Sequence, residues 1–349
     1  MDKKILEEPQ RLDREGMLDD LDNFPRQVEE AIEIGKESKG IIDGYNFDNV
    51  CVTGMGGSAI VGDLLSKFIY PRTIVNRSYS LPEGIEKKDL LIAVSYSGNT
   101  EETLSALREG LEKDMSIVCI STGGKLKDLC EENLLPFVQI PKGYQPRAST
   151  GYMLFPLLEI FLSQGLAKDY DRGRLITRLK ELSELYGSDK TLENNPAKQL
   201  SVDLYGKVPL VYGTEKNTKA VSYRWKTQFN ENSKQPAFWN VFPELNHNET
   251  VGYELSNTLM GNAIVLILKN GLENERNELR IEVMKKILKE NDITFRIIEN
   301  TEGESIERII GQIYYGDYVS NYLALLNEED PSPVELIEKF KKEMKTKEV

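Results

Sequence analysis

The sequence predicts an α/β protein with two doubly wound domains, each a mostly parallel sheet flanked by helices, and with an N-terminal helix. Its 349 residues suit about two domains, since a domain averages roughly 150 residues. Short apolar, β-branched runs alternate with helical segments in both halves, which is typical of parallel strands joined by helices. Hydrophobic residues make up 40% of the chain and charged residues 29%, which suits a protein with a buried core.

The first half of the chain alternates strands and helices after an opening helix. Apolar side chains recur at helical spacing over residues 13–38, where Pro25 predicts an interruption. The strands predicted next cover residues 49–53, 73–75, 90–94, 116–121 and 137–140. The predicted helices cover residues 58–69, 100–113, 125–132, 149–165 and 171–187.

A polar stretch at residues 188–195 predicts the boundary between the domains. We expect an N-terminal helical segment over residues 1–45, a first domain over 46–192 and a second domain over 193–349. The strands predicted in the second domain cover residues 208–212, 262–268 and 293–298, and its helices cover 217–229, 273–290, 305–326 and 331–347.

Charge and hydropathy exclude several classes of protein. The formal net charge is −13, and Lys and Arg form no run before the short tail after Phe340, so nucleic acid is not an expected partner. The longest apolar runs, such as residues 263–268, are far shorter than the ~20 residues that span a bilayer. The N-terminus also lacks the apolar core of a signal peptide. We therefore expect no membrane partner.

The cysteines and the single histidine limit the choice of cofactor. Cys51, Cys119 and Cys130 show no metal-ligand spacing, and an odd number without a framework indicates a reducing compartment. We expect a cytoplasmic protein in which these thiols are small buried hydrophobic groups. His247 is the only histidine, so a site with two or three histidines cannot form within one chain. A magnesium site made of carboxylates alone stays open but has no sequence signature, and we expect no cofactor.

Residues 54–59, Gly-Met-Gly-Gly-Ser-Ala, form a glycine turn between a predicted strand and a predicted helix. Glycine lets the backbone turn sharply and approach an anion, which the free N–H groups of a helix N-terminus stabilise. The turn also fits the G-x-G-x-x-A dinucleotide fingerprint, which expects an acidic residue about 20 positions later. The chain has Asn76 and Arg77 there, and an arginine could accept an NADP phosphate, so an NADP-linked oxidoreductase stays an alternative.

Residues 95–100, Ser-Tyr-Ser-Gly-Asn-Thr, form a serine turn that also joins a strand to a helix. Its three aliphatic hydroxyl groups are neutral donors, which together with the helix dipole can hold a phosphate dianion without a lysine or a metal. An ordinary N-cap would explain Thr100 and the following Glu101 and Glu102, but not Ser95 and Ser97. The turn therefore predicts a phosphate site.

The two turns together resemble the sugar-isomerase (SIS) domain. Three further motifs resemble the bifunctional phosphoglucose/phosphomannose isomerases: Pro-Arg-Ala-Ser at 146–149, Phe-Asn-Glu-Asn-Ser-Lys at 229–234 and Pro-Glu-Leu-Asn-His-Asn-Glu at 243–249. The resemblance covers essentially the whole chain after the N-terminal helix. It implies two SIS domains per chain and an active site at the interface of a homodimer.

The resemblance also implies the reaction and its substrates. Glucose 6-phosphate and mannose 6-phosphate would each be interconverted with fructose 6-phosphate, as in glycolysis and gluconeogenesis. This isomerisation moves a proton between C1 and C2 through an enediolate, so it needs a base, a positive charge beside the oxyanion, and an acid/base that opens the sugar ring. We expect the substrate phosphate to lie on Gly57, Ser58, Ser95, Ser97 and Thr100.

Glu231 is the expected base. It follows a helix whose apolar positions, Val221, Trp225 and Phe229, should pack inward and carry the carboxylate toward the domain interface, where partial desolvation raises basicity. The alternative is a surface acid near a helix end. Arg147 is expected to stabilise the enediolate oxygen, because a guanidinium group stays charged. The alternative for Arg147 is an ion pair with a surface acid, which is the usual role of an arginine.

His247 and a lysine of the last helix are expected to open the sugar ring. An ordinary histidine pKa of about 6.5 suits this proton transfer, and the resemblance implies that His247 comes from the neighbouring subunit. Residues 330–334 resemble the family's entry into the last helix, with Ser332 where a threonine is expected, and the spacing favours Lys339. Lys341 and Lys342 stay open as alternatives, as does a solvated basic helix end.

A different class of protein also fits the two turns. A sugar-phosphate-binding SIS regulator would keep the fold and the phosphate site but not catalyse isomerisation. It predicts binding without turnover. The joint presence of Glu231, Arg147 and His247 favours the enzyme.

Overall fold

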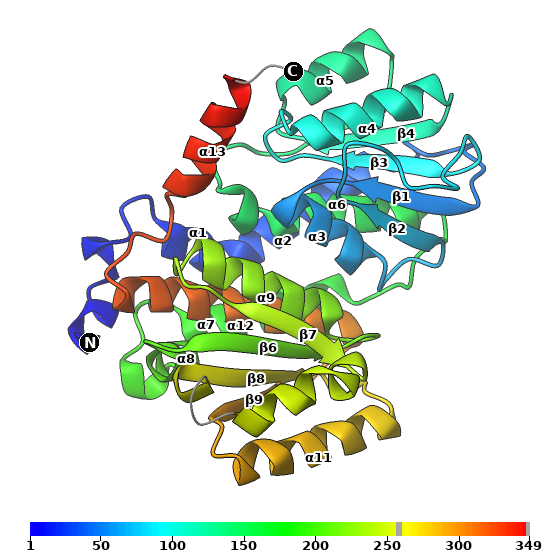
Figure 1. Cartoon of the computed structure of the whole chain (residues 1–349). Helices are drawn as coiled ribbons and strands as arrows, with labels where there is room; N and C mark the ends of the chain where they lie inside the picture. The colour runs from blue at the N-terminus through cyan, green and yellow to red at the C-terminus, as the bar shows by residue number, and fades with distance from the viewer. Residues whose placement is uncertain (256–259, 347–349) are drawn as a thin grey trace. The chain divides into compact units, whose positions relative to one another are not determined.

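The computed structural model describes residues 1–255 and 260–346, which form two compact units (Figure 1). The five-stranded unit comprises residues 23–183 and 302–310. The four-stranded unit comprises residues 1–22, 184–301 and 311–349. None of the helices within the described ranges is long and apolar enough to cross a membrane.

The sheet of the five-stranded unit is parallel throughout and has the strand order β2-β1-β3-β4-β5. Its strands are β1 (Asn49–Thr53), β2 (Arg72–Asn76), β3 (Leu90–Val94), β4 (Ser116–Ser121) and β5 (Phe137–Gln139). The helices that alternate with them are α3 (Gly56–Leu65), α4 (Glu101–Glu112) and α5 (Gly124–Glu132). One core cluster packs α4 and α5 against the sheet and includes Cys51, Cys119 and Cys130, so the prediction of three buried thiols is confirmed.

Helix α2 (Phe24–Glu37) packs against α6 (Thr150–Ser163) in the same unit. The predicted interruption of the N-terminal helix falls at Asn23, between α1 (Met17–Asp22) and α2. Pro25 lies in the first turn of α2, where a missing N–H group costs no helical hydrogen bond. Two further helical segments of this unit are the short η3 (Pro146–Ala148) and α7 (Arg172–Tyr186), whose last residues lie beyond the unit.

The sheet of the four-stranded unit is also parallel and has the order β7-β6-β8-β9. Its strands are β6 (Val208–Thr214), β7 (Phe238–Phe242), β8 (Ala263–Lys269) and β9 (Phe295–Glu299). Its α-helices are α1, α8 (Pro196–Leu204), α9 (Lys219–Glu231), α11 (Glu275–Glu290), most of α12 (Ser305–Leu326) and α13 (Glu335–Lys345). Short helical segments are η1 (Lys3–Leu6), η2 (Pro9–Arg11), η4 (Leu192–Asn194), η5 (Glu244–His247), η6 (Glu249–Leu255) and η7 (Met260–Asn262). The two parallel sheets flanked by helices agree with the predicted fold class, although β7 and α8 were not predicted.

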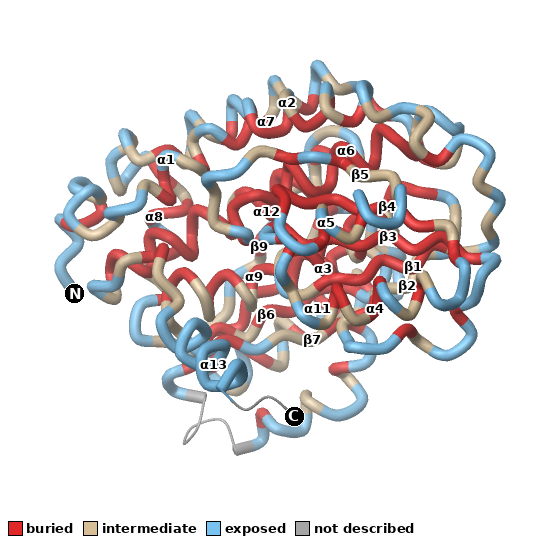
Figure 2. The backbone as a smooth tube through the Cα atoms, turned by 90° about the horizontal axis from the view of Figure 1, so that it is seen from above, coloured by how far each residue is buried: buried red, intermediate tan, exposed pale blue. Residues whose placement is uncertain are grey.

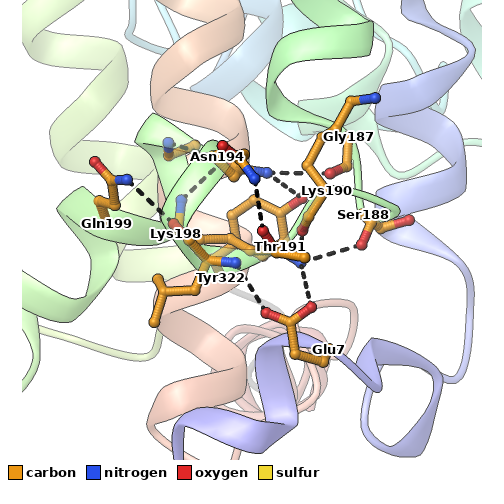
Figure 3. Close-up of polar contacts among 12 residues, drawn as sticks. Glu7, Gly187, Ser188, Lys190, Thr191, Asn194, Lys198, Gln199 and Tyr322 are labelled. Carbon is orange, nitrogen blue, oxygen red and sulfur yellow. Dashed lines mark hydrogen bonds and ion pairs between the residues drawn. The ribbon is translucent and has the colours of Figure 1, made fainter.

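A buried lysine ties the N-terminal segment to this unit (Figure 3). The Lys198 ammonium on α8 donates to the backbone carbonyls of Ser188 at 3.1 Å and Lys190 at 2.6 Å, and lies 3.8 Å from the Glu7 carboxylate. Burial lowers the pKa of Lys198, and the ring of Tyr322 lies beneath the ammonium. These contacts join Ser188, Lys190 and Glu7 to α8, and join α8 to Tyr322 of α12.

Candidate active site

The glycine turn connects β1 to the N-terminus of α3 in the five-stranded unit. A Cβ atom on Gly54 would lie 2.9 Å from the carbonyl oxygen of Val94, and one on Gly57 would lie 3.2 Å from the carbonyl oxygen of Pro146. Gly56 has a φ of +51°, in the left-handed region that favours glycine. The turn therefore needs glycine, and Met55 at the N-cap gives α3 no side-chain cap.

The serine turn connects β3 to the N-terminus of α4. The Ser95 hydroxyl lies 2.9 Å from the Thr100 hydroxyl and accepts a bond from the Gly98 N–H at 3.1 Å. The exposed Ser97 hydroxyl accepts from the Asn99 N–H at 3.2 Å. Thr100 occupies the N-cap position of α4, but its side chain forms no cap bond. An ordinary N-cap therefore does not account for the Thr100 side chain.

The two turns lie at the carboxyl edge of neighbouring strands. Thr53 at the end of β1 is paired with Ala93 near the end of β3. The Tyr96 N–H of the serine turn donates to the buried Ser58 hydroxyl of α3 at 3.4 Å, which joins the turns directly. Two helix N-termini and several neutral hydroxyl groups thus lie along one edge of the sheet, an arrangement that stabilises an anion.

Arg147 lies on a short helix whose backbone packs against the glycine turn. It is the central residue of η3 and only 3% exposed, and its guanidinium donates to the Gln145 side-chain oxygen at 3.4 Å. Its Cα atom would lie 3.5 Å from a Cβ atom on Gly57. The structure therefore places Arg147 against Gly57, one of the five residues predicted to bind phosphate, and all six residues belong to the five-stranded unit.

Glu231 is the last residue of α9 and is half-buried in the four-stranded unit. Its backbone carbonyl accepts a bond of 2.8 Å from the Lys234 ammonium, which also donates to the carbonyl of Pro331 at 3.0 Å. The buried Asn232 and Ser233 side chains donate to the hydroxyl and the carbonyl of Ser320 on α12. The chain around Glu231 is thus held by Pro331 and by Ser320 of α12. Lys234 belongs to the sequence motif at 229–234, which predicted no role for it, and it supplies part of this support.

His247 ends the short helix η5 and is exposed. The segment that carries it is anchored by the buried Leu245 and by Glu249, whose carboxylate accepts from the Tyr212 hydroxyl and from the Asn240 amide, the latter at 2.6 Å. Burial raises the pKa of Tyr212, so its hydroxyl group stays protonated and can donate to Glu249.

Lys339 lies on α13, which is exposed along its whole length (Figure 2). Its exposed apolar side chains at helical spacing form what we call the apolar face of α13: Leu336, Ile337, Phe340 and Met344. The segment before it is held by the buried Ser332, whose N–H donates to the Asp330 carboxylate at 2.9 Å.

Arg77, on which the NADP alternative depends, follows β2 and forms an ion pair with Asp63 of α3. An arginine that receives the 2′-phosphate of NADP would need its guanidinium turned to that phosphate. The carboxylate of Asp63 occupies part of its bonding capacity, which argues against the dinucleotide interpretation of the glycine turn.

Comparisons with known proteins find relatives in sequence and, separately, solved structures with a similar fold. A family model described as the bacterial phospho-glucose isomerase C-terminal SIS domain matches residues 193–344. A bifunctional phosphoglucose/phosphomannose isomerase from Caldicellulosiruptor bescii is 40% identical over 94% of this chain and 98% of its own length. The protein of the same name from Aquifex aeolicus is 34% identical over 86% of this chain and 91% of its own length.

Among solved structures, a hypothetical protein from Thermus thermophilus has a TM-score of 0.73 at 17% identity and covers 98% of this chain and 94% of its own. This likeness concerns the fold alone. Together with the SIS family model and the two parallel sheets, it confirms the predicted SIS-type fold class.

Proposed function

The chain belongs to the family of bifunctional phosphoglucose/phosphomannose isomerases, and on that premise we propose that it interconverts glucose 6-phosphate and mannose 6-phosphate with fructose 6-phosphate. The observation that carries the proposal is the 40% identity to a protein of that name over nearly the full length of both chains. The hydroxyl groups of the serine turn beside two helix N-termini support a phosphorylated substrate.

The substrate phosphate binds to Gly57, Ser58, Ser95, Ser97 and Thr100. The N-termini of α3 and α4, whose N-cap side chains form no cap bond, contribute backbone N–H groups and the positive ends of two helix dipoles. Neutral donors suffice there, because the charge of the dianion is stabilised by dipoles and hydrogen bonds rather than by a counterion.

Glu231 takes the proton from one of the two carbons C1 and C2 and returns it to the other. The enediolate formed between these steps carries its negative charge on oxygen, and Arg147 stabilises it. The half-buried position of the Glu231 residue and the near-complete burial of Arg147 support these roles, since a preorganised group in a partly dry site acts more strongly than a solvated one.

His247 and Lys339 open the sugar ring by moving a proton between the ring oxygen and the anomeric hydroxyl. The protein is a homodimer, and His247 acts in the site of the neighbouring subunit. The exposed position of His247 at the end of η5 supports this proposal, because a second chain can reach it.

The remaining assignments follow the family. The first SIS domain covers residues 46–192 and the second 193–349, after an N-terminal segment over 1–45, and the match of the C-terminal SIS model to 193–344 supports the second range. The enzyme acts in the cytoplasm, in keeping with its three free and buried thiols.

A coupled assay in EDTA tests the proposal by offering glucose 6-phosphate and mannose 6-phosphate separately and following fructose 6-phosphate. We expect turnover of both, and no turnover by the Glu231→Gln variant purified in the same way. Turnover of glucose 6-phosphate alone would reject the second specificity. Binding of both sugars without turnover would favour the non-catalytic regulator, and activity that EDTA abolishes and Mg²⁺ restores would contradict a metal-free mechanism.

A further inference from the structure

Gln27 is a buried amide in the contact between two helices. It lies on the face of α2 that packs against α6, and it is only 1% exposed. Burying an amide in such a contact is unfavourable unless its donor and acceptor both find partners, so its bonds indicate what the residue does.

The nitrogen and the oxygen of the Gln27 side-chain amide both form hydrogen bonds with the backbone where η3 ends and α6 begins. Its nitrogen donates to the carbonyl of Ala148 at 3.0 Å. Its oxygen accepts from the backbone N–H groups of Gly151 at 2.9 Å and Tyr152 at 3.4 Å, two of the N–H groups that the first turn of α6 leaves without helical partners. One side chain thus fixes the end of η3 and the start of α6 together.

The close fit around this amide leaves little room for adjustment. A Cβ atom on Gly151 would lie 2.6 Å from the Gln27 side-chain oxygen, so glycine is needed for the two helices to approach. One turn further along α2, the Glu30 carboxylate accepts from the Tyr152 hydroxyl at 2.5 Å. The first turn of α6 is therefore held by two side chains of α2.

The residue directly before Ala148 is Arg147. The backbone of η3 also lies against the glycine turn, since the Pro146 carbonyl would be 3.2 Å from a Cβ atom on Gly57. If the Ala148 carbonyl shifted, η3 would rotate about its contact with Gly57. The Arg147 guanidinium would then move. Gln27 lies 121 residues earlier in the chain than Ala148. The orientation of η3 therefore depends on a side chain of α2.

We propose that Gln27 is a positioning residue for Arg147: its amide holds η3 in the one orientation that places the guanidinium for catalysis. The inference rests on the proposed role of Arg147 in stabilising the enediolate. It assigns to α2 a part in the isomerase reaction beyond covering α6.

A double-mutant cycle tests the inference. Gln27→Met keeps the length of the side chain but removes both hydrogen bonds, and Gln27→Glu keeps the acceptor for Gly151 but loses the donor to Ala148. In the wild-type background we expect either variant to lower kcat about 10-fold with KM for glucose 6-phosphate changed less than about 3-fold, because Arg147 acts mainly on the transition state. In the Arg147→Ala background the same change should alter kcat less than about 2-fold.

Gln199→Met is the matched control. The exposed Gln199 amide also donates to backbone carbonyls, those of Leu192 and Glu193 at 3.2 and 2.8 Å, but it belongs to the four-stranded unit. Gln199→Met should leave kcat unchanged in the wild-type and in the Arg147→Ala background.

The outcomes separate the inference from the proposed function. An equal loss of kcat from the Gln27 variants with and without Arg147 would overturn the inference while leaving the role of Arg147 intact. An Arg147→Ala variant with wild-type kcat would overturn both. If Gln27→Met does not fold, the double-mutant cycle is measured with Gln27→Glu and Gln27→Asn instead.

Discussion

The hydroxyl groups of Ser95 and Thr100 lie 2.9 Å apart, across the turn between β3 and α4. Ser95 is 1% exposed and also accepts from the Gly98 N–H, so the pair holds the serine turn closed from within. The geometry of the proposed phosphate site therefore depends on a bond between two of the side chains proposed to line it.

Replacing Thr100 with valine removes, at constant side-chain shape, both that bond and the hydroxyl group proposed to bind the phosphate. We expect KM for hexose 6-phosphates to rise about 10-fold, in the range for a lost hydrogen bond to a charged group, with kcat changed less than about 2-fold. Steady-state kinetics and competitive inhibition by inorganic phosphate measure the change. Thr177→Val on α7, which loses an exposed bond to the Gly173 carbonyl, is the control, and an unchanged KM in Thr100→Val would contradict the assignment.

Ser97 tests the phosphate site without disturbing the core. Among the residues that the structure describes, its exposed hydroxyl group has one hydrogen-bond partner, the Asn99 N–H at 3.2 Å. The Tm of Ser97→Ala should therefore lie within about 1 °C of the wild-type Tm. We expect KM for hexose 6-phosphates to rise several-fold while kcat stays near the wild-type value. A normal KM would show that Ser97 does not contact the phosphate.

Glu231→Gln keeps the size of the side chain but removes the base. We expect kcat to fall by about 10²–10⁴-fold, the usual contribution of general acid–base catalysis, while inorganic phosphate still binds. The specific measurement is exchange of the substrate C2 hydrogen with deuterated solvent, which should cease. Glu290→Gln, at the exposed end of α11, is the matched control, and exchange at the wild-type rate in Glu231→Gln would exclude Glu231 as the base.

Much of the fold could be predicted because hydrophobic patterning acts locally. The strands at residues 49–53 and 90–94 are buried runs, and their neighbouring positions in the parallel sheet bring the two turns to one edge. Strand β7 gave a weaker pattern because it is an edge strand: Phe238 is exposed while Val241 and Phe242 are buried. Its irregular burial does not follow a strict alternation.

The support of the candidate site could not be predicted from the sequence. Gln27 and Lys198 look like solvated residues of amphipathic helices, because their partners depend on the tertiary fold rather than on local spacing. Gln27 bonds to a carbonyl 121 residues away, and Lys198 meets Glu7 of the N-terminal segment. The motif residues themselves were recognisable because the turns that carry them are short and contiguous.

The register of α13 can be tested on its lysines. At 3.6 residues per turn, Lys339 and Lys341 flank the apolar face of α13, whereas Lys342 lies on the opposite side. We expect Lys339→Met to lower kcat for glucose 6-phosphate by about 100-fold, as for loss of an acid/base group, and Lys342→Met to have no effect. The rate of anomer interconversion, followed by NMR, should fall with Lys339→Met as well. A loss of activity in Lys342→Met alone would place the ring-opening lysine on the other side of the helix.

Asp20 in α1 links the stability of the fold to pH. Burial, with repulsion from Asp13 and Asp19, raises the pKa of Asp20 from 3.8 to about 6. A carboxyl group with a raised folded-state pKa contributes stability that is complete below pH 3.8 and is lost as the pH rises through about 6. We therefore expect Asp20→Asn to raise Tm by about 2 °C at pH 7.5 in low salt and to leave it unchanged near pH 4. Thermal unfolding of both proteins across this range measures the difference, with Asp128→Asn on the exposed side of α5 as the control. A difference in Tm that does not vary with pH would mean that the charge of Asp20 is not what destabilises the fold at neutral pH.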